Sequence, residues 1–144
     1  MEGIGRSLIF PTWEQIVLLN RRHIEETGGE WIGYDNMRNP GSLKWVLDAI
    51  QYPLFAVYSY PTLAEKAAIL AWVIIDGHVF YDGCKRTGMS ALEIFILLNG
   101  YQVIASGDEI RNTAIRVAKH VEDGFIYEEF VSWVRSKMSL KTVA

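Results

Sequence analysis

The sequence has little of several features that would assign it to a particular class of protein. Its only cysteine is Cys84, so no disulfide can form within the chain, which suits a reducing compartment. Its longest apolar run, residues 67–75, is much shorter than the roughly 20 residues that a helix needs to cross a bilayer. The apolar run at the amino terminus is too short for a signal peptide. We therefore expect a soluble, cytoplasmic protein with no membrane partner.

The sequence also has no large excess of positive or negative charge. The formal net charge is −3 at pH 7, and 22% of the residues are charged. A balance of this kind gives no general attraction to nucleic acid, so we expect no DNA binding by the chain itself. Any site for an anionic ligand must therefore be local.

Hydrophobic residues make up 50% of the 144 residues, and they recur at helical spacing. The length fits one domain over residues 1–144, with no repeat or internal linker. Capping-box patterns predict helix starts at Thr12, Thr62 and Ser106, with Gln15, Glu65 and Glu109 three residues later. We expect helices up to residues 27, 76 and 120 from these starts, and further helices over 42–51, 89–98 and 127–138. Residues 101–106 are either a short strand or an extended link. The predicted fold class is all-α, a compact bundle of about six helices.

A polar segment, DGHVFYDGCKRTG at residues 76–88, separates the two most apolar predicted helices. If residues 84–87 form the first turn of the second helix, its unpaired N–H groups and its dipole attract an anion. Gly83 lets the backbone approach a ligand closely, and Lys85 and Arg86 add two positive charges. Basic side chains oppose the dipole at this end of a helix, so an anion between them would explain their presence. The segment predicts a phosphate site, although a solvated first turn without a ligand accounts equally well for the two basic residues.

His78 and Asp82 stand four residues apart in the same segment. A neutral imidazole can accept a proton from a hydroxyl, and a carboxylate beside phosphates can hold Mg²⁺. A structural histidine and an N-capping aspartate are the alternative for each residue taken alone. The full set between residues 78 and 86 favours phosphoryl chemistry, and we expect Phe80 to bury its ring and fix the loop. His23 and His120 have no partner at metal-ligand spacing and are interpreted as structural or exposed.

The residues HVFYDGCKRTG (78–88) resemble the signature of the Fic/Doc family, H-x-F-x-[D/E]-G-N-[G/K]-R. Residues 60–101, the core motif region, resemble the death-on-curing (Doc) branch of that family, as do PTWEQIVLLNRRHIEETGG and RNPGSLKWVLDAI. The resemblance covers most of the chain. It implies a Fic/Doc-type helical bundle whose active-site loop joins two central helices.

The resemblance also implies roles for the residues of the motif. In the family, the motif histidine is the general base that activates a target hydroxyl, which here is His78, and the acidic residue, here Asp82, is the metal ligand for Mg²⁺. The catalytic set is then His78, Asp82, Lys85 and Arg86. The nucleotide-binding set is Gly83, Cys84, Lys85, Arg86 and Thr87.

Two positions separate the branches of the family. Doc-type members carry lysine where Lys85 stands and transfer the terminal phosphoryl group of ATP, whereas Fic-type members usually carry glycine and transfer AMP. A second arginine often follows the Fic signature, and Met89 stands at that position here. Both residues favour the Doc branch, and AMP transfer to a protein hydroxyl is the alternative.

The activity implied by resemblance is that of an ATP-dependent phosphotransferase. It would use ATP and Mg²⁺ to phosphorylate a serine or threonine of a component of the translation machinery, as the toxin of a toxin–antitoxin pair. The chain lacks the [S/T]-x-x-x-E-[G/N] inhibitory helix of some Fic proteins. We therefore expect inhibition by a separate, Phd-like antitoxin protein.

Cys84 departs from the family signature, which has asparagine at this position. A thiol is a weaker hydrogen-bond donor and acceptor than a carboxamide. Three outcomes are open: the enzyme tolerates the change, it is weakened, or the chain is a Fic-fold binding module without activity. A thiol at a helix N-terminus beside Lys85 and Arg86 is expected to have a lowered pKa. Control by oxidation of Cys84 is therefore a further hypothesis.

Overall fold

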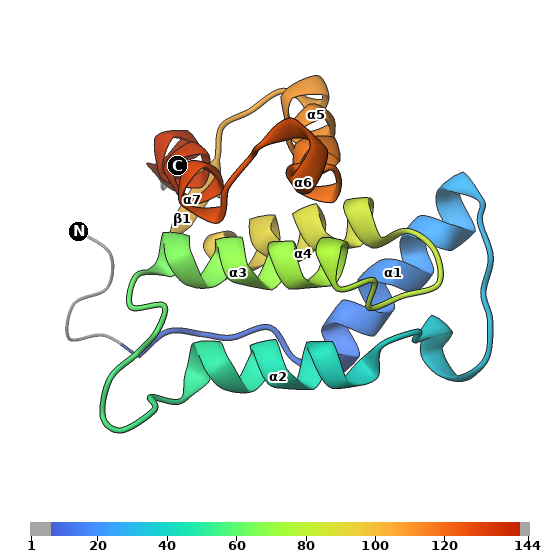
Figure 1. Cartoon of the computed structure of the whole chain (residues 1–144), viewed down its shortest axis with the longest axis horizontal. Coiled ribbons are helices and arrows are strands. Elements are labelled where there is room, and N and C mark those ends of the chain that lie inside the picture. The colour runs from blue at the N-terminus through green and yellow to red at the C-terminus, as the bar shows by residue number, and fades with distance from the viewer. Residues whose placement is uncertain (1–6, 142–144) are drawn as a thin grey trace.

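The computed structural model describes residues 7–141, and helices account for most of that range (Figure 1). The α-helices are α1 (Trp13–Thr27), α2 (Pro40–Gln51), α3 (Leu63–Asp76), α4 (Cys84–Leu98), α5 (Gly107–Ala118), α6 (His120–Asp123) and α7 (Tyr127–Lys137). A short 3-10 helix, η1, covers Tyr34–Asn36, and two strands, β1 (Tyr101–Val103) and β2 (Met138–Leu140), form a small antiparallel sheet. The all-α prediction is confirmed. Residues 1–6, part of the segment judged too short for a signal peptide, lie outside the described range.

Helices α3 and α4 lie side by side at the centre of the molecule (Figure 1). Helix α3 also contacts α2, α5 and α7, and α4 also contacts α1 and α5. Ten of the 14 residues of α3 are buried, as expected for a helix that is apolar nearly all round. No helix within residues 7–141 has the length and apolar character needed to cross a membrane.

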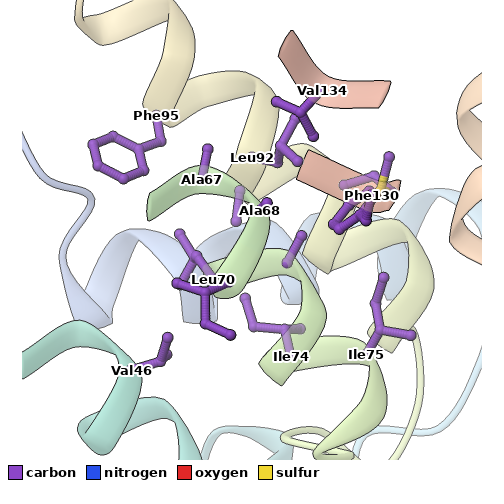
Figure 2. Close-up of a cluster of buried hydrophobic side chains, with 14 of the residues drawn as sticks. Val46, Ala67, Ala68, Leu70, Ile74, Ile75, Leu92, Phe95, Phe130 and Val134 are labelled. Carbon is purple, nitrogen blue, oxygen red and sulfur yellow. The ribbon is translucent and has the colours of Figure 1, made fainter. Parts of the chain in front are cut away.

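The core lies between α3, α4 and the helices that cover them. Figure 2 shows buried side chains from α2 (Val46), α3 (Ala67, Ala68, Leu70, Ile74, Ile75), α4 (Leu92, Phe95) and α7 (Phe130, Val134). Burying one large aliphatic or aromatic side chain contributes about 1.5–3 kcal/mol. The packing fixes α3 and α4 relative to each other, and therefore both ends of the loop that joins them.

The helix starts predicted from the three capping-box patterns agree with the structure. The Thr12 and Ser106 side chains accept hydrogen bonds from the N–H groups of Gln15 and Glu109, and the Thr62 hydroxyl oxygen accepts one from Glu65 N–H. Helix α2 begins two residues earlier than predicted, because Pro40 fits the first turn, where no N–H donor is needed.

The short sheet resolves one open choice and adds one element. Residues 101–103 form a strand rather than an extended link, and they pair with residues 138–140. The second strand was not predicted, because three residues are too few to show a period-two pattern.

Candidate active site

The polar loop joins the end of α3 to the start of α4, which begins at Cys84 rather than at residue 89, so residues 84–87 do form its first turn. Gly83 is the N-cap residue, with a left-handed backbone at φ +78°. A Cβ atom at this position would lie 2.9 Å from Nδ2 of Asn20. Both the backbone angle and the close approach therefore require glycine here.

Phe80 anchors the middle of the loop, as predicted, and is only 1% exposed. It pairs with Met37 in an isolated antiparallel bridge. The carbonyl of Val79 accepts hydrogen bonds from the N–H groups of Arg38 (2.8 Å) and Asn39 (3.1 Å). The segment before α2 therefore holds the loop in place along its length.

Two buried asparagines, for which no sequence motif predicts a role, hold the end of the loop. Asn20 on α1 donates from Nδ2 to the carbonyl of Asp82 (2.8 Å) and to Oγ1 of Thr87 (3.1 Å). Asn36 donates from its own Nδ2 to Oδ1 of Asn20 (3.0 Å). Both asparagines have no exposed surface. A polar residue at an apolar position of the predicted first helix was the one available signal for Asn20.

The carboxylate of Asp82 is oriented by two backbone N–H groups. Oδ1 accepts from Gly83 at 2.8 Å, and Oδ2 accepts from Glu30 at 3.0 Å. Each oxygen keeps a second lone pair. Among the described residues no group of three or more His, Cys, Asp or Glu side chains could hold a metal on its own. Mg²⁺ needs only one or two carboxylates when phosphate oxygens supply other ligands, so Asp82 fits a nucleotide-borne Mg²⁺.

A pocket of about 560 Å³ opens beside the start of α4. Its charged end consists of predicted residues, Asp82, Gly83, Cys84, Lys85 and Arg86. Its apolar wall comes from α4 and α5, with Met89, Ile110, Ala114 and Ile115, and its other polar residues include His23, Ser90 and Glu93. The volume lies within the range of about 300–1,000 Å³ that is typical of small-molecule sites.

Two predicted residues do not line this pocket. Thr87 is fully buried, and its hydroxyl contacts Asn20 beneath the first turn of α4. His78 is exposed on the loop, with φ +47°. The amide of Asn39 donates to the carbonyls of Gly77 and His78, each at 2.9 Å, so the backbone that carries the imidazole is fixed.

The prediction that the Cys84 thiol has a lowered pKa was wrong. Burial raises the pKa of the Cys84 thiol, and this outweighs both its hydrogen bond to Phe80 and the nearby charge of Lys85. The thiol donates to the carbonyl of Phe80 at 3.2 Å. A raised pKa gives no reason for preferential oxidation at this thiol, and the side chain instead ties the helix start to the loop.

His23 faces the pocket, and sequence analysis assigned it only a structural or exposed role. Its Nε2 lies 2.8 Å from Oγ of Ser90, so the pair joins α1 to α4. Burial, and then the charge of Arg86, lower the pKa of His23, while burial raises the pKa of Glu93. The pocket therefore combines a hydroxyl with an imidazole and a carboxyl group whose neutral forms are both favoured by burial.

The helical bundle and the polar loop between its two central helices are the architecture expected of a Fic/Doc-type fold. Residues 10–96 match the Fic/DOC family, and the chain belongs to that family. Among its relatives, "Toxin Doc" of Mycolicibacterium smegmatis is 32% identical over 91 residues, which cover 62% of this chain and 70% of the relative. "Protein kinase doc" of Escherichia phage P1 is 28% identical over 93 residues, which cover 65% of this chain and 70% of the relative. The resemblance to the death-on-curing branch is confirmed.

Proposed function

We propose that this protein is a Doc-like toxin that transfers the terminal phosphoryl group of ATP to a serine or threonine hydroxyl of a translation component. The observation that carries the proposal is the charged end of the pocket. There an oriented carboxylate, a helix N-terminus and two basic side chains lie together. The names of the two relatives, a toxin and a protein kinase, support the same function.

In this proposal the phosphates of ATP bind to the start of α4. The free N–H groups of its first turn and the side chains of Lys85 and Arg86 supply donors and positive charge. Asp82 would hold Mg²⁺, and the metal would supply neutralisation of charge on the phosphate oxygens. The apolar wall that α4 and α5 contribute suits the less polar part of a nucleotide.

His78 is the proposed base for the acceptor hydroxyl. It takes the hydroxyl proton as the oxygen attacks the terminal phosphorus, and ADP leaves. Its exposure suits a macromolecular acceptor, because a hydroxyl on the surface of another protein can reach only an exposed base. Its fixed backbone suits a base that must meet that hydroxyl in one geometry.

The test compares ATP labelled at the γ- or the α-phosphate, incubated with Mg²⁺, the protein and a cell extract. Label transferred only from the γ-phosphate supports phosphoryl transfer, and label from the α-phosphate would show AMP transfer instead. His78→Ala and Asp82→Asn are expected to abolish transfer. His120→Gln is the matched control, because His120 pairs with Asp76 outside the pocket.

The same labelling test with the variant Cys84→Asn shows whether Cys84 impairs the enzyme. If neither label is transferred but the variant Cys84→Asn transfers the γ-phosphate, the chain is an impaired enzyme. If neither protein reacts but both bind ATP, the chain is a Fic-fold binding module.

The proposal includes a partner and a location. We place the protein in the cytoplasm, where ATP and the translation machinery are found, as one domain over residues 1–144 that a separate Phd-like antitoxin inhibits. The name of the mycobacterial relative supports the pairing. Expression of the chain alone is expected to arrest growth, and co-expression of a neighbouring small open reading frame is expected to restore it.

A further inference from the structure

Ser90 and His23 form a hydrogen-bonded pair that the proposed transfer to a target does not use. Ser90 belongs to α4 and His23 to α1, and their Oγ and Nε2 atoms are 2.8 Å apart. Both residues line the pocket that holds the charged end of the motif. Both also line a neighbouring pocket of about 430 Å³, so the pair stands between two hollows rather than inside the core.

The chemistry of the pair is that of an activated hydroxyl. A serine within hydrogen-bonding distance of a base is the arrangement that makes a weak nucleophile reactive. The pKa of His23 is lowered by burial and by Arg86, against a smaller opposing effect of Glu26. Both effects favour the neutral form of the imidazole. In the tautomer with its proton on Nδ1, Nε2 is free to accept the proton of Ser90.

The position of Ser90 places its hydroxyl close to the proposed phosphate site. Arg86 and Ser90 are four residues apart on α4, so they share a face of the helix with Cβ atoms about 5–6 Å apart. Both side chains face the same pocket. A phosphate held by Arg86 is thus one helical turn from a hydroxyl that already has its base.

We propose that Ser90 is a phosphorylation site of this protein itself. The hydroxyl oxygen of Ser90 bonds to the terminal phosphorus of ATP, the bond to the bridging oxygen breaks, ADP leaves, and His23 takes the hydroxyl proton. The inference rests on the proposed function, since it requires ATP in the pocket. The product carries a charge of about −1.5 to −2 beside Arg86 and Lys85, where it competes with the phosphates of the next nucleotide.

The experiment incubates the purified chain with Mg²⁺ and ATP and measures phosphate on Ser90 by peptide mass spectrometry, with label transfer to a cell extract followed in parallel. We expect phosphate at position 90 in the unaltered chain and, on the threonine hydroxyl, in Ser90→Thr, and a loss of at least tenfold in His23→Gln. We expect Ser136→Ala, a serine on α7 outside both pockets, to be phosphorylated normally at Ser90.

The variant His78→Ala separates the two activities. Because His23 rather than His78 serves Ser90, this variant is expected to keep phosphate on Ser90 while losing transfer to the extract. An unmodified Ser90 in a chain that labels the extract overturns the inference and leaves the proposed function standing. Phosphate on Ser90 that survives His23→Gln but not His78→Ala also overturns it. If neither Ser90 nor the extract is labelled, both proposals fail.

Discussion

The segment from His78 to Met89 has two sides that differ in burial and in chemistry. On the buried side, Phe80 and Thr87 are at most 1% exposed; Phe80 pairs with Met37 ahead of α2, and the Thr87 hydroxyl accepts a hydrogen bond from Asn20 on α1. On the other side, Lys85 and Arg86 are exposed at the pocket. The buried side fixes the shape of the loop, and the open side carries two positive charges at the pocket.

Residues that hold the loop in place and residues that line the pocket are therefore different residues, although they lie only a few positions apart in the sequence. Neighbours in the sequence, such as Arg86 and Thr87, have opposite surroundings because successive residues of a helix point about 100° apart. Substitutions on the buried side are therefore expected to lower the free energy of unfolding first. Those on the open side are expected to change ligand binding with little effect on folding.

The largest expected effect on stability is that of Phe80→Ala. Removing a fully buried phenylalanine ring costs about 3–5 kcal/mol, since it leaves a cavity that the neighbours cannot fill. The measurement is urea denaturation followed by circular dichroism. Phe80→Leu is the control, because it keeps much of the buried volume and is expected to lose less than half as much. Equal losses in the two variants would show that the ring does not anchor the loop.

Asn20→Leu is expected to have the next largest effect. It leaves the carbonyl of Asp82 and the amide of Asn36 without their partner, and each buried unsatisfied group costs about 1–3 kcal/mol. The control is Arg21→Ala, which removes an exposed side chain of the same helix and is expected to change stability by less than about 0.5 kcal/mol. Amide hydrogen exchange is also expected to rise in the loop for the first variant alone. Unchanged protection there would contradict the positioning role of Asn20.

Gly83→Ala is expected to be less costly, and it has a matched control in Gly100→Ala. Both glycines have a left-handed backbone, which costs other residues about 1–2 kcal/mol. A Cβ at Gly83 also meets Asn20 at 2.9 Å, whereas a Cβ at Gly100 meets no described atom within 4 Å beyond the residue itself and its two chain neighbours. The difference in melting temperature between the two variants measures the contact with Asn20. A Gly100 variant as unstable as the Gly83 variant would mean that only the backbone angle matters.

The sequence was sufficient to predict the framework around the site. Capping residues such as Thr12 and Ser106 act within four residues of themselves, so their patterns are readable without any knowledge of tertiary contacts. The motif itself placed Asp82 to Arg86 at the start of a helix, and the structure gathers these residues at one pocket.

The sequence was not sufficient where the partners are distant along the chain. Asn20 meets Asp82 across 62 positions, and the Glu30 N–H that orients the carboxylate lies 52 positions away. No local pattern encodes such contacts. The thiol of Cys84 was misjudged for a similar reason, because local charges predicted a low pKa whereas burial, a tertiary property, decided its direction.

The open side of the motif is expected to show the reverse balance of effects. Lys85→Gln and Arg86→Gln should change the free energy of unfolding by less than about 0.5 kcal/mol, since both side chains are exposed. Each should weaken ATP binding measured by calorimetry by about tenfold, which corresponds to losing one charge-assisted hydrogen bond of roughly 1.4 kcal/mol. Lys44→Gln, an exposed lysine on α2, is the control. Unchanged ATP affinity in both variants would exclude the start of α4 as the phosphate site.

The smallest expected effect is the pH dependence of stability that Cys84 contributes. This residue is half-buried and also lines the pocket, so it lies between the two sides. Its pKa is raised in the folded chain, so the unfolded chain loses the thiol proton first, near pH 8.5. At pH 7 both states keep the proton and no effect arises. As the pH rises above about 8.5, the folded state binds more protons than the unfolded state, and stability falls. The measurement is the melting temperature of the unaltered chain and of Cys84→Ser between pH 7 and pH 9.5. Over this range the melting temperature of the unaltered chain should fall relative to that of Cys84→Ser. Iodoacetamide should also react more slowly with the folded chain than with the unfolded chain at pH 8.5. A faster reaction with the folded chain would show that the pKa of Cys84 is lowered rather than raised.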